Sequence, residues 1–391
     1  MPSTKARQVL TPAASVPMIR SSQFALLILC LTTFNVQAEQ QRARDLGIAP
    51  GIFQPGTHNA ITDVKGVKVG HVTLHQGKSI HTGVTVVIPA EGNLRKRKVP
   101  AAIYIANGYG KLAGISQLQE LGEIETPIAL TNTLNVAEGI AGIVEWTLAQ
   151  PGNEDVYSVN AVVGETNDGR LNDIRKRAVT IEHVKAAISS ASSGPVPEGN
   201  VGAGAGTVAF MWKGGIGTSS RQLPEALGGW TLGVLVQSNY GGILTIDGVQ
   251  VGKALNQYYL QDTVERQKAD GSIMIVVATD APLSSRNLER LAKRAIVGLA
   301  RTGAVVSNGS GDYVIAFSNH PDLRRDDSTD TLSTSVLHNS DMSPLFQAVA
   351  EATEEAIYNA LFMAEDLDGH RMNVKALPLN KVRKLVAETK Q

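Results

Sequence analysis

Short apolar runs recur along the chain from residue 61 onwards, and turn-prone residues such as glycine and asparagine separate them. Alternation of apolar and polar residues is typical of a half-buried strand. A continuous apolar run, such as residues 273–278, instead indicates a strand buried on both faces. The pattern predicts strands around residues 61–74, 83–89, 101–106, 156–164, 207–213, 231–238, 273–278 and 313–318.

Other segments carry a helical pattern. The clearest is 286–301, where apolar residues fall three and four positions apart and form one stripe. Thr180 and Ser343 are suitable N-cap residues, and Pro344 suits the first helical position. The pattern predicts helices over residues 134–149, from about 180 to 191, over 286–301, and from 343 to about 364.

The order of these elements predicts the fold class. Strands and helices are interleaved without a repeated βαβ unit, which favours one α/β domain with layered sheets and outer helices. The Ser/Pro/Gly-rich segment 192–206 and the polar segment 320–341 are predicted loops. The charged segment 261–271 is either a domain linker or an exposed loop within the domain.

Composition narrows the class of protein. Hydrophobic residues make up 43% of the 391 residues and charged residues 18%, so the chain can bury a sizeable core and is not disordered as a whole. Lys and Arg total 36 and Asp and Glu total 36, a balance that does not suggest a nucleic-acid binder.

The N-terminal residues have the pattern of a secretory signal peptide. Arg20 precedes the apolar run 24–31, and Val36 and Ala38 supply the small residues of a cleavage site. We therefore expect residues 1–38 to be removed and the mature protein to lie in the periplasm, with no membrane attachment afterwards. The sole cysteine, Cys30, would leave with the signal, so we expect no disulfide and no thiolate chemistry.

Common catalytic and cofactor motifs are missing. The chain has no H-E-x-x-H, P-loop or G-x-S-x-G sequence, and its eight histidines are scattered. Gly202, Gly204 and Gly206 lack the spacing of a dinucleotide fingerprint. We therefore expect no metal and no cofactor.

Serine chemistry by self-activation is a remaining possibility. If the bond between Gly271 and Ser272 is broken by the Ser272 hydroxyl, the serine becomes a chain terminus with its own amine beside its hydroxyl. That amine has an ordinary pKa of about 7.7–8.0, which suits a general base. A Gly-Ser pair is by itself a weak signal, because an ordinary turn at the start of a strand has the same sequence.

Five motifs, in order along the chain, resemble the L-aminopeptidase/D-amidase-esterase family, which includes the β-peptidyl aminopeptidases. The resemblance covers nearly all of the chain after residue 38. The motifs are Gly-Gly-Ile-Gly-Thr-Ser-Ser-Arg at 214–221, Val-Leu-Val-Gln-Ser-Asn-Tyr-Gly at 234–241, Asp-Gly-Ser-Ile at 270–273, Val-Val-Ala-Thr-Asp-Ala-Pro at 276–282 and Asn-Gly-Ser-Gly-Asp at 308–312.

The resemblance implies a fold and a maturation step. The fold would be a four-layer α/β/β/α sandwich, like N-terminal-nucleophile hydrolases in its layers but with a different connectivity. Residues 39–391 would form one hydrolase domain. This domain would cleave its own chain into residues 39–271 and residues 272–391. The two chains would stay together as a heterodimer, and four heterodimers would form a homotetramer.

The resemblance also implies roles for individual residues. Ser272 would be the nucleophile and Asn239 the side-chain donor to the oxyanion. Ser310 and Asp312 would position and tune the Ser272 amine, although the family often has Glu in place of Asp312. Glu165 would hold the free amino group of the substrate. Asn167 would be a further catalytic residue, at a position where some relatives have a catalytic tyrosine.

The leading hypothesis is a periplasmic aminopeptidase that releases N-terminal residues from short peptides, amides or esters through an acyl-enzyme. One alternative is a non-catalytic periplasmic binding protein with the same fold. The other is an acyltransferase of the ornithine acetyltransferase-like type, although those enzymes use threonine where this chain has Ser272. The sequence leaves open whether the substrates are L-α-, D- or β-amino acyl compounds.

Overall fold

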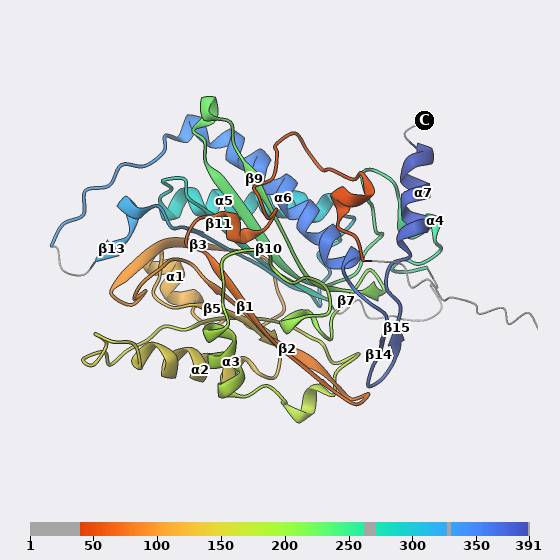
Figure 1. Cartoon of the computed structure of the whole chain (residues 1–391), viewed down its shortest axis with the longest axis horizontal. Coiled ribbons are helices and arrows are strands. Elements are labelled where there is room, and N and C mark those ends of the chain that lie inside the picture. The colour runs from red at the N-terminus through yellow and green to blue at the C-terminus, as the bar shows by residue number, and fades with distance from the viewer. Residues whose placement is uncertain (1–39, 262–270, 327–329, 390–391) are drawn as a thin grey trace, which may run out of the picture. The chain divides into compact units, whose positions relative to one another are not determined.

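Two β-sheets lie face to face, and helices cover the outer face of each (Figure 1). The computed structural model describes residues 40–261, 271–326 and 330–389. These residues fall in one compact unit. The predicted signal peptide, residues 1–38, lies outside the described residues.

The smaller sheet has four strands in the order β1 (Lys68–Gln76), β2 (Ile80–Ile88), β5 (Ile128–Asn132) and β6 (Val162–Thr166). β5 and β6 are parallel, and the other pairs are antiparallel. α2 (Val136–Leu148) and α3 (Ile181–Ser189) pack on its outer face. The apolar cluster between this sheet and its helices includes Val84, Val86, Ala129, Ile143, Val163 and Val184.

The larger sheet has the order β13-β3-β12-β11-β10-β9, with β4 also paired to β3. β11 and β12 are parallel, whereas the other neighbours are antiparallel. α5 (Ser285–Arg301) and α6 (Ser343–Phe362) cover its outer face. The strands are β3 (Arg97–Gly108), β4 (Glu123–Ile124), β9 (Gly215–Gln222), β10 (Thr231–Asn239), β11 (Ser272–Thr279), β12 (Gly311–Ser318) and β13 (Arg325–Asp326).

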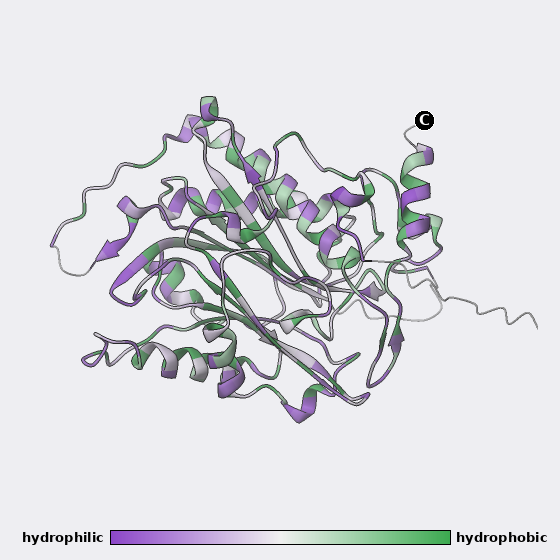
Figure 2. Cartoon of the chain, in the orientation of Figure 1, coloured by the Kyte–Doolittle hydropathy of each residue, from purple (hydrophilic) through white to green (hydrophobic). Residues whose placement is uncertain are grey.

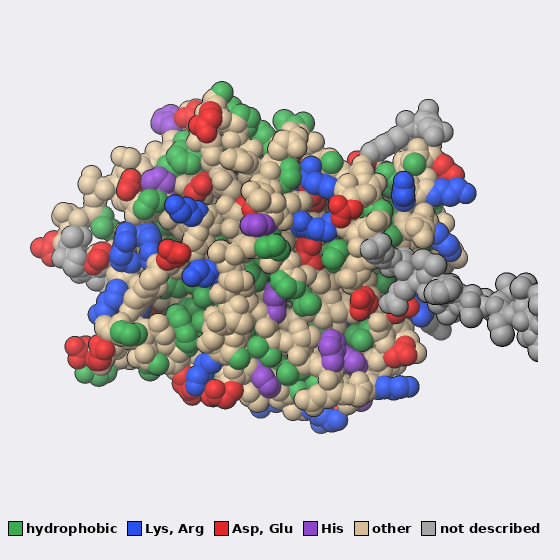
Figure 3. Space-filling view, in the orientation of Figure 1, with side chains coloured by type: hydrophobic (Ala, Val, Ile, Leu, Met, Phe, Trp, Pro, Cys, Tyr) green, Lys and Arg blue, Asp and Glu red, His purple; other side chains and the backbone are tan. Residues whose placement is uncertain are grey.

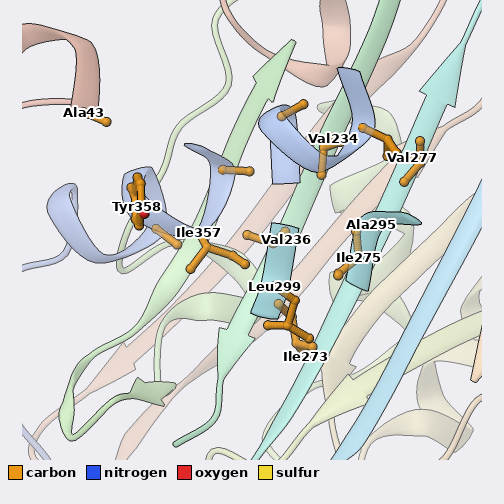
Figure 4. Close-up of a cluster of buried hydrophobic side chains, with 14 of the residues drawn as sticks. Ala43, Val234, Val236, Ile273, Ile275, Val277, Ala295, Leu299, Ile357 and Tyr358 are labelled. Atoms are coloured by element: carbon orange, nitrogen blue, oxygen red, sulfur yellow. The ribbon is translucent and has the colours of Figure 1, made fainter. Parts of the chain in front are cut away.

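β11 shows how the sequence builds these layers. Ile273, Ile275 and Val277 point toward α5 and α6 and pack in the cluster drawn in Figure 4. The intervening side chains, such as Met274 and Val276, pack between the two sheets. Alternate residues of a strand point to opposite faces, so a continuous apolar run supplies both layers. The predicted α/β/β/α layering is confirmed, and Figure 2 shows the hydrophobic colour running along the central strands.

Shorter elements complete the fold. A two-stranded hairpin, β14 and β15, precedes the last helix, α7. The 3-10 helices are Ala43–Leu46, Ile61–Asp63, Ile174–Lys176, Gly202–Gly204, Glu225–Leu227, Pro321–Leu323 and Asn339–Met342. The other elements are α1 (Ile115–Leu121), α4 (Val251–Ala254), α7 (Leu379–Thr389), β7 (Val208–Ala209), β8 (Trp212–Lys213), β14 (Leu367–Asp368) and β15 (Asn373–Val374).

Several predicted boundaries are wrong. Ser343 is the first residue of α6 rather than its N-cap, because a 3-10 turn runs directly into the helix and places Met342 at the cap. The predicted strand 207–213 is a tight hairpin, in which Phe210 and Met211 adopt left-handed backbone angles. The pattern also missed β5, which is short, and β9, which mixes apolar with small polar residues. It missed α7 as well, although its buried residues Leu379, Val382 and Val386 have helical spacing.

The surface is mixed in charge. Figure 3 shows basic and acidic side chains interspersed over the visible face. The sequence leads one to expect this, because it has as many Lys and Arg residues as Asp and Glu residues. Among the helices that the structure describes, none is both long enough and apolar enough to span a bilayer.

Candidate active site

A cavity of about 490 Å³ opens where Ser272 begins β11 and β6 ends in the facing sheet. Four of the predicted site residues line it: Glu165, Asn167, Gly271 and Ser272. Asn239, Ser310 and Asp312 are not part of its wall but lie close to Ser272 through the pairing of the strands. The complete wall consists of Tyr109, Lys111, Thr133, Glu165, Asn167, Gly169, Arg170, Ile174, Gly271, Ser272, Gly309 and Arg371.

Strand register brings the predicted residues together around Ser272. Asn239, the last residue of β10, is its antiparallel partner on one side. Gly311, the first residue of β12, is its parallel partner on the other side, and the next pair is Ile273 with Asp312. The side chain of Ser272 is buried, and its Oγ accepts a hydrogen bond of 3.2 Å from the Gly311 amide.

The peptide group between Gly271 and Ser272 is tightly enclosed. The carbonyl oxygen of Gly271 also accepts the Gly311 amide, at 3.2 Å, so a donor already polarises this peptide group. A Cβ on Gly271 would lie 2.5 Å from the Cα of Tyr240, closer than a real Cβ approaches. Only glycine therefore fits at this position without a shift of the backbone.

The amide of Asn239 is held by two backbone groups. Its Oδ1 accepts the Val208 amide at 2.9 Å, and its Nδ2 donates to the carbonyl of Asn167 at 3.1 Å. An asparagine amide has two N–H groups, so one donor remains for a ligand. The side chain of Asn167 is exposed, and its Oδ1 accepts the Gly169 amide at 3.0 Å.

Ser310 and Asp312 form a buried pair beside β11. The Ser310 hydroxyl lies 2.6 Å from Oδ1 of Asp312. Burial raises the pKa of Asp312 to about 6, and the hydrogen bond from Ser310 opposes this shift. Within the described part of the chain, Ser272 has no direct hydrogen bond to either side chain, and Gly311 stands between them.

Glu165 is a buried acid in the wall of the cavity. Its Oε1 accepts the Lys111 amide at 2.9 Å, and its Oε2 accepts the Thr133 hydroxyl. Burial raises the pKa of Glu165, while these two hydrogen bonds and the charge of Lys111 oppose the rise. Glu165 forms no ion pair among the residues that the structure describes, so its charge suits an incoming ammonium group.

Sequence reasoning missed the residues that support this site from elsewhere in the chain. Asn107 of β3 donates through Nδ2 to the carbonyls of Ser307, Asn308 and Ser310, and thereby holds the turn before β12. Thr133 holds Glu165 from the loop after β5. No local pattern marks either residue, since each acts only through contacts between segments distant in sequence.

The described residues contain no cluster of His, Cys, Asp and Glu that could hold a metal ion. The chemistry of the pocket wall is instead that of hydroxyl, amide, carboxylate and basic groups. A buried serine hydroxyl and an acid line one cavity, and Asn239 next to the serine has an N–H to spare. These are parts that acyl transfer requires.

The layers and this cavity define the class: an α/β/β/α hydrolase fold with its cavity at the start of a central strand. The chain belongs to peptidase family S58, whose family model matches residues 59–375. This confirms the predicted family and the prediction of an aminopeptidase-type enzyme.

Named relatives agree with this assignment. The chain is 39% identical over 393 residues to the beta-peptidyl aminopeptidase BapA of Sphingosinicella microcystinivorans, covering 93% of this chain and 98% of that one. A crystal structure of a Pyrococcus horikoshii OT3 protein matches with a TM-score of 0.83 and 46% identity, over 90% of this chain and all of that one.

A third relative bears on the fold. The L-aminopeptidase D-Ala-esterase/amidase of Ochrobactrum anthropi matches with a TM-score of 0.81 and 34% identity, over 89% of this chain and 99% of that one. That structure is described as a variant among the Ntn hydrolase fold. The predicted kinship with N-terminal-nucleophile hydrolases is confirmed at the level of the fold.

Proposed function

We propose that this protein is a self-processing serine aminopeptidase that cleaves its own chain between Gly271 and Ser272. The observation that carries the proposal is the geometry at that bond. Ser272 Oγ and the Gly271 carbonyl share one donor, the Gly311 amide, at the mouth of a cavity with a buried acid.

Self-cleavage begins with attack of Ser272 Oγ on the carbonyl carbon of Gly271. The carbon–nitrogen bond breaks, the hydroxyl proton passes to the departing amine, and an ester joins Gly271 to Ser272. Water then hydrolyses the ester and leaves a carboxylate on Gly271. The Gly311 amide supports the negative charge that develops on the carbonyl oxygen, and glycine at 271 leaves the carbonyl carbon unhindered.

Peptide hydrolysis then uses the new amine of Ser272 as its general base. The substrate ammonium group lies at Glu165, and Ser272 Oγ attacks the carbonyl carbon of the substrate. The Ser272 amine takes the hydroxyl proton and passes it to the leaving amine or alcohol as the scissile bond breaks, which forms an acyl-enzyme that water then hydrolyses. The remaining N–H of Asn239 stabilises the oxyanion, a contribution of about 2.7–4 kcal/mol per donor. Ser310 and Asp312 hold and tune the amine from the side of β12.

The substrates we propose are short peptides, amides or esters with a free N-terminal amine. The names of the relatives support β-amino acyl compounds and D-alanyl esters or amides as candidates. We further propose that residues 1–38 direct the chain to the periplasm, and that chains 39–271 and 272–391 assemble as a tetramer of heterodimers. Finding residues 1–38 still attached to the protein in the cytoplasm would refute the export proposal.

The test compares the wild type with Ser272→Ala, Ser272→Cys and, as a matched control, Ser189→Ala, an exposed serine of α3. We expect the wild type and the control to yield two chains that comigrate in native conditions and separate on a denaturing gel. Ser272→Ala should stay a single folded, inactive chain, and Ser272→Cys should process in part because a thiol can make the same attack.

Mass spectrometry of the two chains and p-nitroanilide hydrolysis followed over time complete the test. Activity should appear only as the intact chain disappears, since the amine exists only after cleavage. A single intact chain 39–391 with full activity would overturn the mechanism, and one with binding but no hydrolysis would favour the non-catalytic alternative.

A further inference from the structure

Basic side chains gather at the pocket, which the proposed chemistry does not explain. Lys111, Arg170 and Arg371 line the cavity and are all exposed, whereas Glu165 is the sole acid in its wall and is buried. Glu165 accounts for one positive charge of a substrate. Three cations around the same cavity indicate a negatively charged group on the ligand as well.

Arg371 reaches the pocket from far along the chain. It lies at the tip of the hairpin formed by β14 and β15, between Leu367–Asp368 and Asn373–Val374. The hairpin is docked on the segment after β6: His370 donates its amide to the Leu171 carbonyl at 2.8 Å, and Arg371 donates its amide to the Arg170 carbonyl at 3.2 Å.

The hairpin is closely packed against this segment. A Cβ on Gly369 would lie 2.7 Å from the Cα of Leu171, so the two backbones are in direct contact. The backbone of Arg371 is therefore fixed beside Arg170, with both side chains at the cavity. Among the described residues, Arg371 has no acidic side chain within ion-pairing distance.

We propose that Arg371 binds the terminal carboxylate of a short peptide substrate, so that the enzyme selects free dipeptides over their amides. The inference rests on the proposed function, because it places the substrate ammonium at Glu165 and its scissile carbonyl at Ser272. The carboxylate of a dipeptide then lies one residue beyond Ser272, about 3.3–3.6 Å further along an extended chain. A guanidinium group matches a carboxylate with two parallel hydrogen bonds.

The test compares two substrates with the same scissile bond, a dipeptide and its C-terminal amide. L-alanyl-L-alanine and β-alanyl-L-alanine are both used, each with its amide. The variants are Arg371→Gln, Arg371→Lys and the matched control Arg175→Gln, an exposed arginine of the 3-10 helix Ile174–Lys176 outside the cavity wall.

We expect Arg371→Gln to lower kcat/KM for the free dipeptide about tenfold through KM, and to change the amide less than about twofold. Arg371→Lys should recover part of the loss, because it keeps the charge without the paired geometry. Arg175→Gln should change neither substrate.

Equal losses on dipeptide and amide, or no loss on the dipeptide, would overturn the assignment of Arg371. If the wild type hydrolyses none of the four compounds and no p-nitroanilide, the proposed function is overturned, and this inference with it. The two failures are thus told apart by the wild-type reaction alone.

Discussion

At the scale of single residues, burial determines what the two acids of the site can do. Glu165 and Asp312 are both buried, and burial raises the pKa of each. Their partners differ, however. Glu165 is held by an amide and a hydroxyl and faces the cavity, which suits a substrate cation, whereas Asp312 is bound to Ser310 away from the cavity wall.

Glu165→Gln removes the charge that lines the cavity and is proposed to hold the substrate amine, and it keeps the size of the side chain. We expect KM for substrates with a free amine to rise roughly tenfold or more, since a charge-assisted hydrogen bond is lost. Self-cleavage should proceed at the wild-type rate, because the bond at Gly271 has no free amine nearby to bind. Steady-state kinetics and the time course of processing measure the two effects, and a parallel loss of both would assign Glu165 a structural role.

The raised pKa of Asp312 makes stability depend on pH. Between its ordinary value of 3.8 and about 6, the folded protein keeps a proton that the unfolded chain has lost. Folding therefore loses stability as pH rises through this window, by up to about 3 kcal/mol for this group. Asp312→Asn lacks this contribution to the pH dependence of stability, because an asparagine amide does not titrate.

The measurement for Asp312 is chemical unfolding of the wild type and Asp312→Asn at several pH values below and above 6. We expect the free energy of unfolding of Asp312→Asn to increase relative to that of the wild type as pH rises. A difference between the two proteins that stays constant with pH would contradict the raised pKa. Hydrolysis by the variant should fall in either case, since Asp312 is proposed to tune the Ser272 amine.

At the scale of the elements, the start of β11 is the point where packing and chemistry meet. β11 lies between β10 and β12 with both faces buried, so its backbone position is fixed by apolar contacts on two sides. Its first residue, Ser272, is therefore held in position, and it pairs with Asn239 on one side and Gly311 on the other. If Ser272 is the nucleophile, as proposed, this placement keeps its geometry after the bond before it is cut.

Gly271→Ala tests this arrangement. The added Cβ would lie 2.5 Å from the Cα of Tyr240, so the start of β11 or the end of β10 must move. We expect self-cleavage to slow by about tenfold or more, because small displacements of reacting atoms have large effects on rate. Gly241→Ala is the matched control, since a Cβ there meets no atom within 4 Å.

Processing of both glycine variants is followed by the disappearance of the intact chain on denaturing gels. Circular dichroism shows whether each remains folded. A Gly271→Ala chain that processes at the rate of Gly241→Ala would show that the close approach to Tyr240 has no part in the reaction.

At the scale of the whole molecule, a buried ion cluster joins the two parts of the chain that self-cleavage would separate. Arg221 of β9 lies 3.2 Å from Glu351 and 2.9 Å from Glu355, both on α6, and its side chain is fully buried. It also donates to the carbonyl of Pro50 at 2.9 Å. Residues before 271 and after 272 are therefore linked by charge as well as by the pairing of β10 with β11.

Arg221→Met should destabilise the protein by about 3–5 kcal/mol, because it leaves Glu351 buried without a cationic partner. Glu355 keeps its pair with Arg44, which limits the damage. The control is Lys293→Met, which breaks an exposed pair with Glu289 and should cost no more than about 1 kcal/mol. Urea unfolding of both variants measures the difference, and equal effects would show that burial of the cluster is unimportant.

The sequence by itself determined the elements whose pattern is local. The continuous run 273–278 specified a strand buried on both faces, and the apolar stripe of 286–301 specified α5, since side-chain spacing along one segment depends only on that segment. Five ordered motifs indicated the family, and through it the α/β/β/α layers. Segments that mix small and polar residues, such as β9, carried no such pattern and were missed.

Tertiary structure alone decided how distant residues meet. Asn239 stands beside Ser272 because β10 and β11 pair in that register, and Glu165 faces the same cavity from the other sheet. Nothing local to Gly311 or Arg371 marks the amide that reaches the Gly271 carbonyl or the guanidinium at the pocket. These contacts depend on the packing of two sheets and a docked hairpin, which periodicity within one segment does not encode.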